Sequence, residues 1–338
     1  MFIRASVNHL LKHNAELKVM SKRVSEKYDV SRLRVIIDAI WCCTVYGTIY
    51  TEYECLDFLH RSHKNRKTYV TVFWLLRKIF KYNDVEEGKI FHDKRRFNEL
   101  FSDFVKRKHV SLLDAPEEEI KEFLENNDRA VMKNSGGCSG KQVHIIDTKD
   151  MSVEDFLTYA RENSYDMAEK VIENCDEIKR LNPTSLNTIR IVTIHSENFF
   201  RVMVACLRIG SVGADVDNVS SGGTVARIDK ETGKIDTTFR VNEFRRLPAS
   251  QAGRDEIGME IPFWEEAVEL VRNASKVLKN THIVGWDVAI TKDGPLLIEG
   301  NESFNTASME LYYDHTQPGL KADFEAALAM VDKDLQKA

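Results

Sequence analysis

Several features that would define a particular class of protein are absent from this 338-residue sequence. Its six cysteines form no Cys-x-x-Cys pair and have no histidine at metal-binding spacing, which disfavours a zinc site and a disulfide framework. We therefore expect free thiols in a reducing compartment, and a cytoplasmic protein. The cysteines are Cys42, Cys43, Cys55, Cys138, Cys175 and Cys206.

Long hydrophobic runs are also missing. The longest apolar stretch, Val35–Tyr50, is interrupted by Asp38 and is too short to span a membrane. We find no signal-peptide pattern, no internal repeat and no low-complexity segment. With 43% hydrophobic and 30% charged residues, the composition predicts a globular protein of two or three packed units.

The charge is unevenly distributed along the chain. Residues 1–110 carry 22 Lys and Arg against 13 Asp and Glu, whereas the remainder carries 26 against 40. Two interpretations stay open: the basic surplus belongs to solvated helix surfaces, or it makes a peripheral contact with anionic lipid or an acidic polymer. We predict no nucleic-acid partner, and the sequence does not define the oligomeric state.

Proline is absent from residues 1–85, where apolar residues recur at spacings of three and four. This period predicts helices. No catalytic grouping occurs in the region, so we expect it to serve packing or recognition.

A glycine-rich segment, residues 134–141, lies between two predicted strands, Arg129–Lys133 and Gln142–Ile146. Backbone N–H groups of such a loop can close over phosphates while Lys133 supplies a fixed positive charge. The segment does not match the pattern G-x-x-x-x-G-K-[ST], and no helix follows it, so a P-loop is disfavoured. A plain hairpin turn is the alternative interpretation.

Arg190 lies among β-branched residues in a predicted strand, Arg190–His195. A buried arginine needs an anionic partner, which is either a carboxylate or a phosphate. Further along, residues 218–224 form a polar loop that could present several hydrogen-bond donors to an anion.

Two apolar runs near the C-terminus, Ile283–Thr291 and Pro295–Ile298, predict a β-hairpin. We expect the three residues 292–294 to form its loop, with Gly294 in the left-handed conformation. This register pairs the last residue of the first run with the first residue of the second.

Counting back along both strands sets Asp287 opposite Glu299, with Asn301 on the same face as Glu299. Like charges directly opposite each other are destabilising, so the pair favours a cation between them. Carboxylate and amide oxygens without His or Cys suit Mg²⁺ better than zinc. The alternative is an ordinary hairpin with two solvated acids.

Taken in order over roughly residues 40–320, these segments resemble the sugar-transfer-associated family of the ATP-grasp superfamily. The resemblance rests on Lys94 in Asp-Lys-x-x-Phe, on Lys133 before the glycine loop, and on a linker strand, Glu169–Ile172. It continues through Asn182–Thr193 and Asn218 with Gly222-Gly223, and ends at Gly285-Trp286-Asp287 and Glu299-Gly300-Asn301. One departure is Asn174-Cys175, where the family often has Gln-His.

The resemblance implies an α+β, ATP-grasp fold in which two α+β subdomains clasp ATP, preceded by a helical N-terminal region. We expect this region at 1–85 and the ATP-grasp domain at 86–338. The first subdomain, 86–165, would carry the glycine loop, and the second, 166–338, the metal-binding hairpin.

The resemblance also implies roles for individual residues. Asp287, Glu299 and Asn301 would bind Mg²⁺, and Arg190, Lys133 and Asn218 would act in catalysis. ATP would contact Lys94, Lys133, Gly136, Gly137, Ser139, Gly140, Glu169, Val171 and Ile172, with the linker backbone reading adenine.

The family resemblance implies an ATP- and Mg²⁺-dependent ligase that joins a small-molecule carboxylate to an amine through an acyl phosphate. The substrates would include sugar-linked ones, in surface-polysaccharide or sugar-conjugate synthesis. Two alternatives are a kinase that phosphorylates a hydroxyl and a non-catalytic nucleotide-binding subunit. The presence of Lys133, Arg190, Asp287, Glu299 and Asn301 argues against the second alternative.

Overall fold

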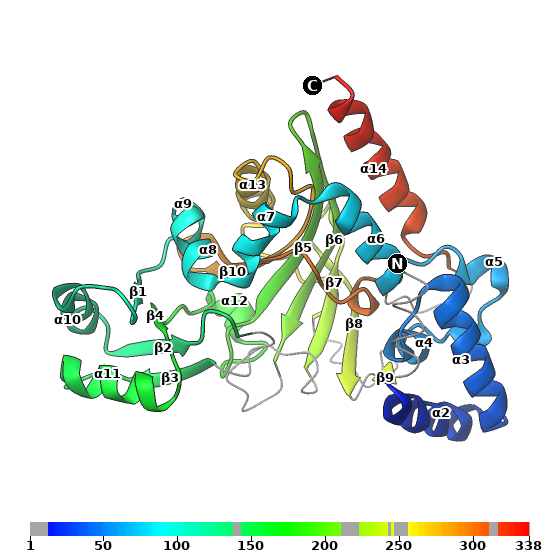
Figure 1. The fold of residues 1–338 in the computed structure, drawn as a ribbon, viewed down its shortest axis with the longest axis horizontal. Coiled ribbons are helices and arrows are strands. Elements are labelled where there is room, and N and C mark those ends of the chain that lie inside the picture. The colour runs from blue at the N-terminus through cyan, green and yellow to red at the C-terminus, as the bar shows by residue number, and fades with distance from the viewer. Residues whose placement is uncertain are drawn as a thin grey trace.

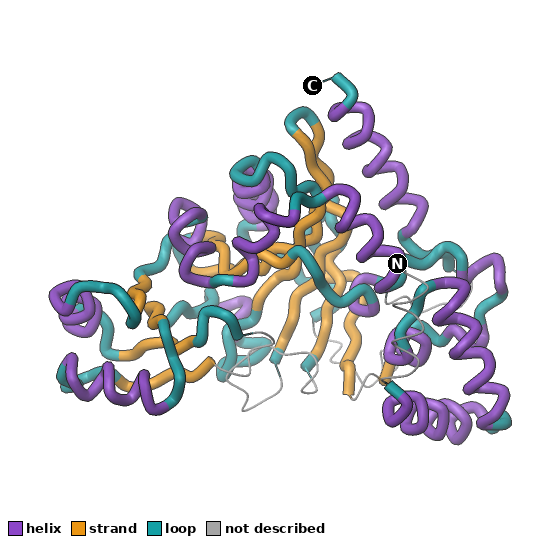
Figure 2. Tube along the Cα trace, in the orientation of Figure 1, coloured by secondary structure: helices purple, strands orange, loops and turns teal. Residues whose placement is uncertain are grey.

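The computed structural model describes residues 13–137, 143–210, 223–242, 245–246, 256–310 and 317–337 (Figure 1). A group of helices lies at one end, a small sheet at the other, and a large sheet between them. Figure 2 shows that strands are confined to the two sheets, whereas the N-terminal group is helical.

The described part of residues 1–85 is helical, as its periodicity predicts. Tyrosines and aliphatic residues form a core of their own, which includes Met20, Val35, Tyr50 and Tyr53. The helices are α2 (Asn14–Tyr28), α3 (Arg32–Tyr46), α4 (Tyr50–Cys55), η1 (Phe58–His60), α5 (His63–Arg66) and α6 (Val72–Tyr82).

The small sheet is antiparallel and has the order β1-β4-β2-β3. Its strands are β1 (His109–Ser111), β2 (Arg129–Lys133), β3 (Val143–Asp147) and β4 (Met167–Lys170). Two helices, α10 (Glu117–Glu125) and α11 (Val153–Glu162), bury Ile120, Phe123 and Phe156 in one core with Met132 of β2.

The large sheet has the order β11-β10-β5-β6-β7-β8-β9 and is also antiparallel. Its strands are β5 (Thr188–Ser196), β6 (Phe199–Ile209), β7 (Thr224–Ile228), β8 (Ile235–Asn242), β9 (Arg245–Arg246), β10 (Ile283–Thr291) and β11 (Gly294–Asn301). Since β11 is an edge strand, one side of its backbone is available to other parts of the chain.

Helices cover both faces of the large sheet. One core joins the sheet to α8 (Lys94–Leu100), α9 (Ser102–Val105) and α13 (Trp264–Ser275). A second core joins it to α6 and α14 (Lys321–Leu335). The short helices α7 (Val85–Gly88), η2 (Lys89–His92), α12 (Asp176–Lys179) and η4 (Ala307–Met309) complete the described elements.

The two sheets do not divide at the expected subdomain boundary between residues 165 and 166. Strand β4 lies after that boundary but pairs with β1 and β2 of the small sheet. Conversely, Phe97 and Phe101 lie before it and pack in the core of the large sheet. The chain thus first contributes helices to the core of the large sheet, then forms the small sheet, and then forms the strands of the large sheet.

Within the described residues, no helix has the length and apolar character needed to cross a bilayer. The five described cysteines are free and buried. Cys138 lies outside the described residues.

Candidate active site

The predicted hairpin is formed by β10 and β11, with a loop different from the expected one. Thr291 pairs with Gly294, so two residues form the loop, and the expected three-residue loop is wrong. Gly294 has the predicted positive φ, at 102°. Its position ends a tight turn, where a side chain would be strained.

A β-bulge restores the pairing that the sequence predicts. Val288 pairs with Leu297 and Asp287 pairs with Glu299, so Ile298 is an extra residue on β11. A bulge adds one residue to one strand of a pair. The loop is one residue shorter than expected and the bulge adds one, and Asp287 therefore lies opposite Glu299 as predicted.

Three charged residues form a row across neighbouring strands. Asp287 of β10 pairs with Glu299 of β11 on one side and with Arg190 of β5 on the other. Arg190 Nε and Nη2 donate to the two Asp287 carboxylate oxygens at 2.5 and 3.0 Å. Arg208 of β6 lies 2.9 Å from the same carboxylate. In this structure the partner of Arg190 is thus a carboxylate.

The electrostatic environment shifts the pKa values of Asp287 and Glu299 in opposite directions. Burial opposes the charge on Asp287, but the guanidinium groups of Arg190 and Arg208 lower its pKa to about 2. Burial and the neighbouring Asp287 carboxylate raise the pKa of Glu299. Glu299 also interacts electrostatically with Lys94, so the row lies within reach of the first predicted phosphate-binding lysine.

The donor set at this row fits a hard cation. Asp287 and Glu299 offer carboxylate oxygens, and the Asn301 amide lies 3.5 Å from Glu299 Oε1. Among the described residues, no group of three or more His, Cys, Asp and Glu side chains is arranged for a metal ion. The candidate ligands at this row are thus the two carboxylates of Asp287 and Glu299 and the amide of Asn301, a combination of oxygen donors that suits Mg²⁺. Both Asp287 oxygens are paired with arginines in this structure.

Lys94 is positioned by the residues around it in the motif Asp-Lys-x-x-Phe. The Asp93 carboxylate accepts hydrogen bonds from the backbone of the first turn of α8, while Phe97 is buried beneath. Lys94 Nζ donates to the carbonyl of Gly137, and its backbone N–H donates to Ser135 at 3.2 Å. Lys94 thereby holds the described start of the glycine loop.

Lys133 ends strand β2 and is almost fully buried. Its Nζ lies 2.5 Å from Glu169 Oε2 on the neighbouring strand β4. Burial would raise the pKa of Glu169, but Arg107 and Lys133 hold it well below its usual range. The charge that we expect Lys133 to present to a phosphate is therefore shared with Glu169 in this structure.

The predicted linker strand is shorter than expected. It ends at Lys170, and Val171 and Ile172 follow it, half-buried. Beyond them, Asn174 binds the backbone N–H of Asn187 and the carbonyl of Asn187, and Cys175 N–H donates to Ile290. The departure Asn174-Cys175 thus fastens the linker to the start of β5 and to β10.

Several predicted residues lie outside the described residues: Ser139, Gly140, Asn218 and Gly222. Gly136 and Gly137 are described and form a turn, in which their N–H groups donate to Asn134. The proposed role of the full loop stays a prediction.

Sequence reasoning missed two arginines. Arg208 lies near the end of the apolar strand β6, where the same argument used for Arg190 could have found it. Arg107 binds Glu169 and is buried, but it belongs to the basic run Lys106-Arg107-Lys108, whose other two residues are exposed. Nothing in that run distinguishes Arg107 from a solvated side chain.

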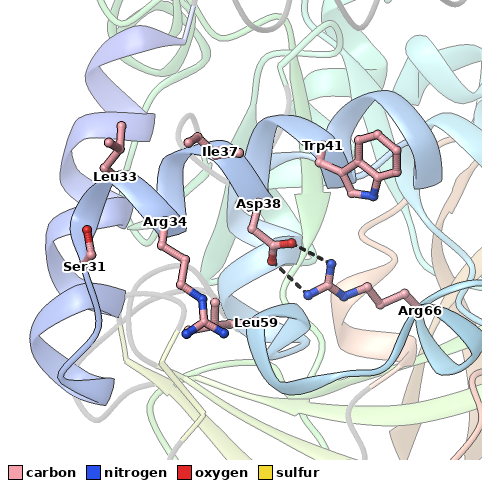
Figure 3. Close-up of a pocket in the computed structure, with 8 residues that line it drawn as sticks. All are labelled: Ser31, Leu33, Arg34, Ile37, Asp38, Trp41, Leu59 and Arg66. Carbon is pink, nitrogen blue, oxygen red and sulfur yellow. Dashed lines mark hydrogen bonds and ion pairs between the residues drawn. The ribbon is translucent and has the colours of Figure 1, made fainter.

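A pocket of the N-terminal helices lies apart from these residues (Figure 3). Its lining includes the ion pair of Arg66 and Asp38, whose atoms lie 2.8 Å apart. The lining residues are Ser31, Leu33, Arg34, Ile37, Asp38, Trp41, Leu59 and Arg66. None of the predicted site residues lines it.

A glycine-loop sheet and a larger sheet with paired acids at its edge hairpin are the features of an ATP-grasp protein. The model of the family described as sugar-transfer associated ATP-grasp matches residues 77–323. The chain belongs to this family, and the N-terminal helices up to α5 and their pocket lie outside the matched region.

Solved structures with a similar fold include ATP-grasp ligase PsnB, in complex with a precursor variant, Mg and ADP. It is 13% identical, with a TM-score of 0.44 over 77% of this chain and 67% of that chain. N5-carboxyaminoimidazole synthase from Aspergillus clavatus is 11% identical, with a TM-score of 0.42 over 69% of this chain and 50% of that chain. D-alanine-D-alanine ligase from Coxiella burnetii is 12% identical, with a TM-score of 0.42 over 75% and 61%. No curated protein matches the chain.

Proposed function

We propose that the protein is an ATP- and Mg²⁺-dependent ligase that joins a carboxylate to an amine through an acyl phosphate. The observation that carries the proposal is the row of Glu299, Asp287 and Arg190 at the edge of the large sheet. It combines a hard-cation site with a guanidinium that can bind phosphate. Membership of the ATP-grasp family supports the use of ATP.

The reaction would proceed in two balanced steps. A carboxylate oxygen of the first substrate attacks the γ-phosphorus of ATP, the bond to the β,γ-bridging oxygen breaks, and ADP leaves. The amine then adds to the acyl carbon, inorganic phosphate leaves, and the amine releases a proton to solvent.

The residues of the site would bind and orient ATP for the first step. Lys94 and Lys133 would contact phosphate oxygens, and the loop that contains Gly136 and Gly137 would cover them. Arg190 would stabilise charge on the transferring phosphoryl group, and Asn218 would contribute a donor toward the tetrahedral intermediate. Mg²⁺ held by Asp287, Glu299 and Asn301 would offset the negative charge of the phosphate oxygens.

The proposed setting is the cytoplasm, in the synthesis of a surface polysaccharide or another sugar conjugate. The family's description as sugar-transfer associated supports this setting. Uronic acids and amino acids are the substrate classes that we would test first. A panel that crosses them, with ADP release as the signal, would identify the acceptor and the amine.

Trapping with hydroxylamine tests the acyl phosphate. A mixed anhydride reacts with hydroxylamine to give a hydroxamate, whereas the phosphate ester made by a kinase does not. We expect the wild-type protein with ATP, Mg²⁺ and a uronic acid, but no amine, to yield hydroxamate. A stable phosphate ester in the ³¹P NMR spectrum, with no hydroxamate, would reject the ligase in favour of a kinase.

Arg190→Ala gives the matching mutational test. Removing one donor to developing charge typically lowers a rate by about 10²–10³-fold. We expect hydroxamate formation to fall by this factor, while the affinity for an ATP analogue falls much less. Arg190→Lys keeps the charge but not the planar fork, so its rate of hydroxamate formation should lie between those of the wild type and Arg190→Ala. Equal losses in binding and in rate would contradict a role in the transition state.

A further inference from the structure

Arg107 occupies an unusual place for an arginine between two exposed lysines. It lies in the connection between α9 and β1, and its side chain is 2% exposed. A buried guanidinium is unfavourable unless its donors are satisfied. The contacts that satisfy them come from β11, from β4 and from α8, where Asn98 Oδ1 accepts from Nη2 at 3.3 Å.

One set of contacts reaches the bulge of the β10–β11 hairpin. Arg107 Nη1 donates to the carbonyl of Leu297 at 2.5 Å, and Nη2 donates to the carbonyl of Ile298 at 3.0 Å. A bulge interrupts the ladder of backbone hydrogen bonds, and β11 has no neighbouring strand on its outer edge. Buried carbonyl groups need donors, and Arg107 supplies them to the residues of the bulge.

The other set of contacts reaches the nucleotide-binding side. Arg107 Nε and Nη2 donate to both oxygens of Glu169, at 2.9 and 3.0 Å. Lys133 binds the same carboxylate. Asn98 of α8, the helix that begins with Lys94, also donates to Glu169, at 2.8 Å. One guanidinium therefore joins the bulge to a carboxylate that binds Lys133 and contacts the helix that begins with Lys94.

The bulge decides which residue faces Asp287. The pairing of Thr291 with Gly294, continued without a bulge, would place Ile298 opposite Asp287. Glu299 would then point to the other face of the sheet, because side chains alternate along a strand. The carboxylate pair exists only because the extra residue is accommodated at position 298.

We propose that Arg107 is a positioning residue that stabilises this bulge, and so holds Glu299 opposite Asp287 and ties the hairpin to Lys133 through Glu169. The inference rests on the proposed function for its consequence in catalysis, but its structural part is independent of ATP. The Arg107 guanidinium donates to none of the three predicted cation ligands, Asp287, Glu299 and Asn301. It acts through the backbone of β11 and the carboxylate of Glu169.

The first experiment measures hydrogen–deuterium exchange of residues 296–300 in Arg107→Met and in Lys108→Met. Both variants remove one positive charge from the same basic run, but only Arg107 is buried. We expect faster exchange at 296–300 in Arg107→Met alone, with the helical circular dichroism signal retained. Exchange equal to wild type in Arg107→Met would overturn the inference.

The second experiment measures Mn²⁺ binding with a non-hydrolysable ATP analogue, since carboxylate and amide oxygens accept Mn²⁺ as well as Mg²⁺. Residues that orient metal ligands typically change the affinity by about 10–100-fold. We expect a loss of that size in Arg107→Met and wild-type affinity in Lys108→Met. Should Arg107→Met fail to fold, Arg107→Lys takes its place, because one ammonium group cannot reach both carbonyls and both Glu169 oxygens.

A rescue separates positioning from general stability. Deleting Ile298 in the Arg107→Met background removes the bulge but keeps Asp287 opposite Glu299, since the ladder is then regular from Thr291 onward. We expect this double variant to regain Mn²⁺ affinity. An unchanged loss would overturn the positioning role. If wild type itself binds no Mn²⁺ with the analogue, the proposed function fails, while the exchange experiment still decides whether Arg107 holds the bulge.

Discussion

Asp287 keeps its charge in a fully buried position because two arginines pair with its carboxylate. Arg190 and Arg208 approach its carboxylate from β5 and β6, and an unpaired charge at this depth would cost several kcal/mol. The hairpin can therefore fold with its charge compensated. A phosphate would compete with Asp287 for the same guanidinium groups, because arginine binds both anions in the same planar geometry.

Glu299→Gln tests the cation site at the level of one residue. The substitution removes a carboxylate whose pKa is raised by burial and by Asp287, so we expect the fold and thermal stability to be retained. Mg²⁺-dependent ATP turnover should fall by about 10²-fold, since one ligand charge is lost. Turnover measured over a Mg²⁺ titration provides the readout. Asp293→Asn, in the exposed loop of the same hairpin, is the matched control and should behave as wild type.

Wild-type turnover in Glu299→Gln with an unchanged Mg²⁺ dependence would remove Glu299 from the site. A variant that unfolds would instead assign the residue a structural role. Circular dichroism of both variants distinguishes these outcomes.

Single residues differ in how far the sequence predicts them. The acids of the hairpin were found because alternation along a strand assigns side chains to a face. Arg107 and its partner Glu169 are 62 residues apart, and neither has a local pattern that marks the pair. Lys133 was predicted as a cation, but its pairing with Glu169 depends on the register of two strands and was not.

At the scale of elements, the sequence predicts that Asp287 pairs with Glu299, but it predicts neither the length of the hairpin loop nor the bulge. The loop is one residue shorter than expected, and the bulge at Ile298 makes up the difference. Hydrophobic alternation constrains which residues face the core, but it does not fix loop length. The donors to the bulge come from Arg107, in the connection between α9 and β1, so the hairpin sequence alone cannot reveal the bulge.

Gly300 lets the helix that carries Lys94 approach the hairpin closely. A Cβ atom at this position would lie 2.4 Å from Phe91 Cε1 and 3.0 Å from Phe97 Cε2. We expect Gly300→Ala to lower the free energy of unfolding by about 1–3 kcal/mol, as overpacking of a core does. The displaced η2 and α8 should also weaken the binding of an ATP analogue. Chemical denaturation and calorimetric titration measure the two effects.

Phe91→Leu offers a second-site test of the same contact. The smaller side chain should recover part of the stability when combined with Gly300→Ala, although alone it removes packing. Additive losses in the double variant would show that the Phe91 ring does not limit the approach.

At the scale of the whole molecule, two buried carboxylates attach the N-terminal helices to the segment that follows the β10–β11 hairpin. Glu52 of α4 accepts hydrogen bonds from Val72 N–H at 3.0 Å and from the Thr306 hydroxyl. Glu310 accepts a hydrogen bond from Val70 N–H at 2.6 Å. The contact between Glu52 and Thr306 joins residues 254 positions apart, and the contact between Glu310 and Val70 joins residues 240 positions apart. The sequence predicted a helical region at 1–85, but such distant partners leave no local pattern by which to place it.

The same two carboxylates should make stability depend on pH. Burial raises the pKa of Glu52 to about 7, and burial, with a smaller effect of Glu52, raises that of Glu310 to about 8. The folded protein then binds more protons than the unfolded chain between the ordinary carboxyl pKa of 4.5 and these values. The free energy of unfolding should therefore fall as pH rises from 4.5 to about 7 for Glu52 and to about 8 for Glu310, by up to about 1.4 kcal/mol per pH unit for each group, and level off above these values. His195, whose pKa burial lowers to about 3, affects stability only below its ordinary value of 6.5.

Urea denaturation between pH 6.5 and 8.5 therefore isolates the effect of the two acids. Glu310→Gln should flatten the pH dependence over this range, because the amide carries no titrating proton while its oxygen still accepts a hydrogen bond from Val70 N–H. Glu325→Gln, an exposed position on α14, should keep the wild-type slope. A slope unchanged in Glu310→Gln would show that Glu310 does not titrate in this range. Protection factors for hydrogen exchange at residues 306–310, which remove the intrinsic effect of pH on exchange, should fall over the same range, since loss of the protonated form weakens the attachment of this segment to the N-terminal helices.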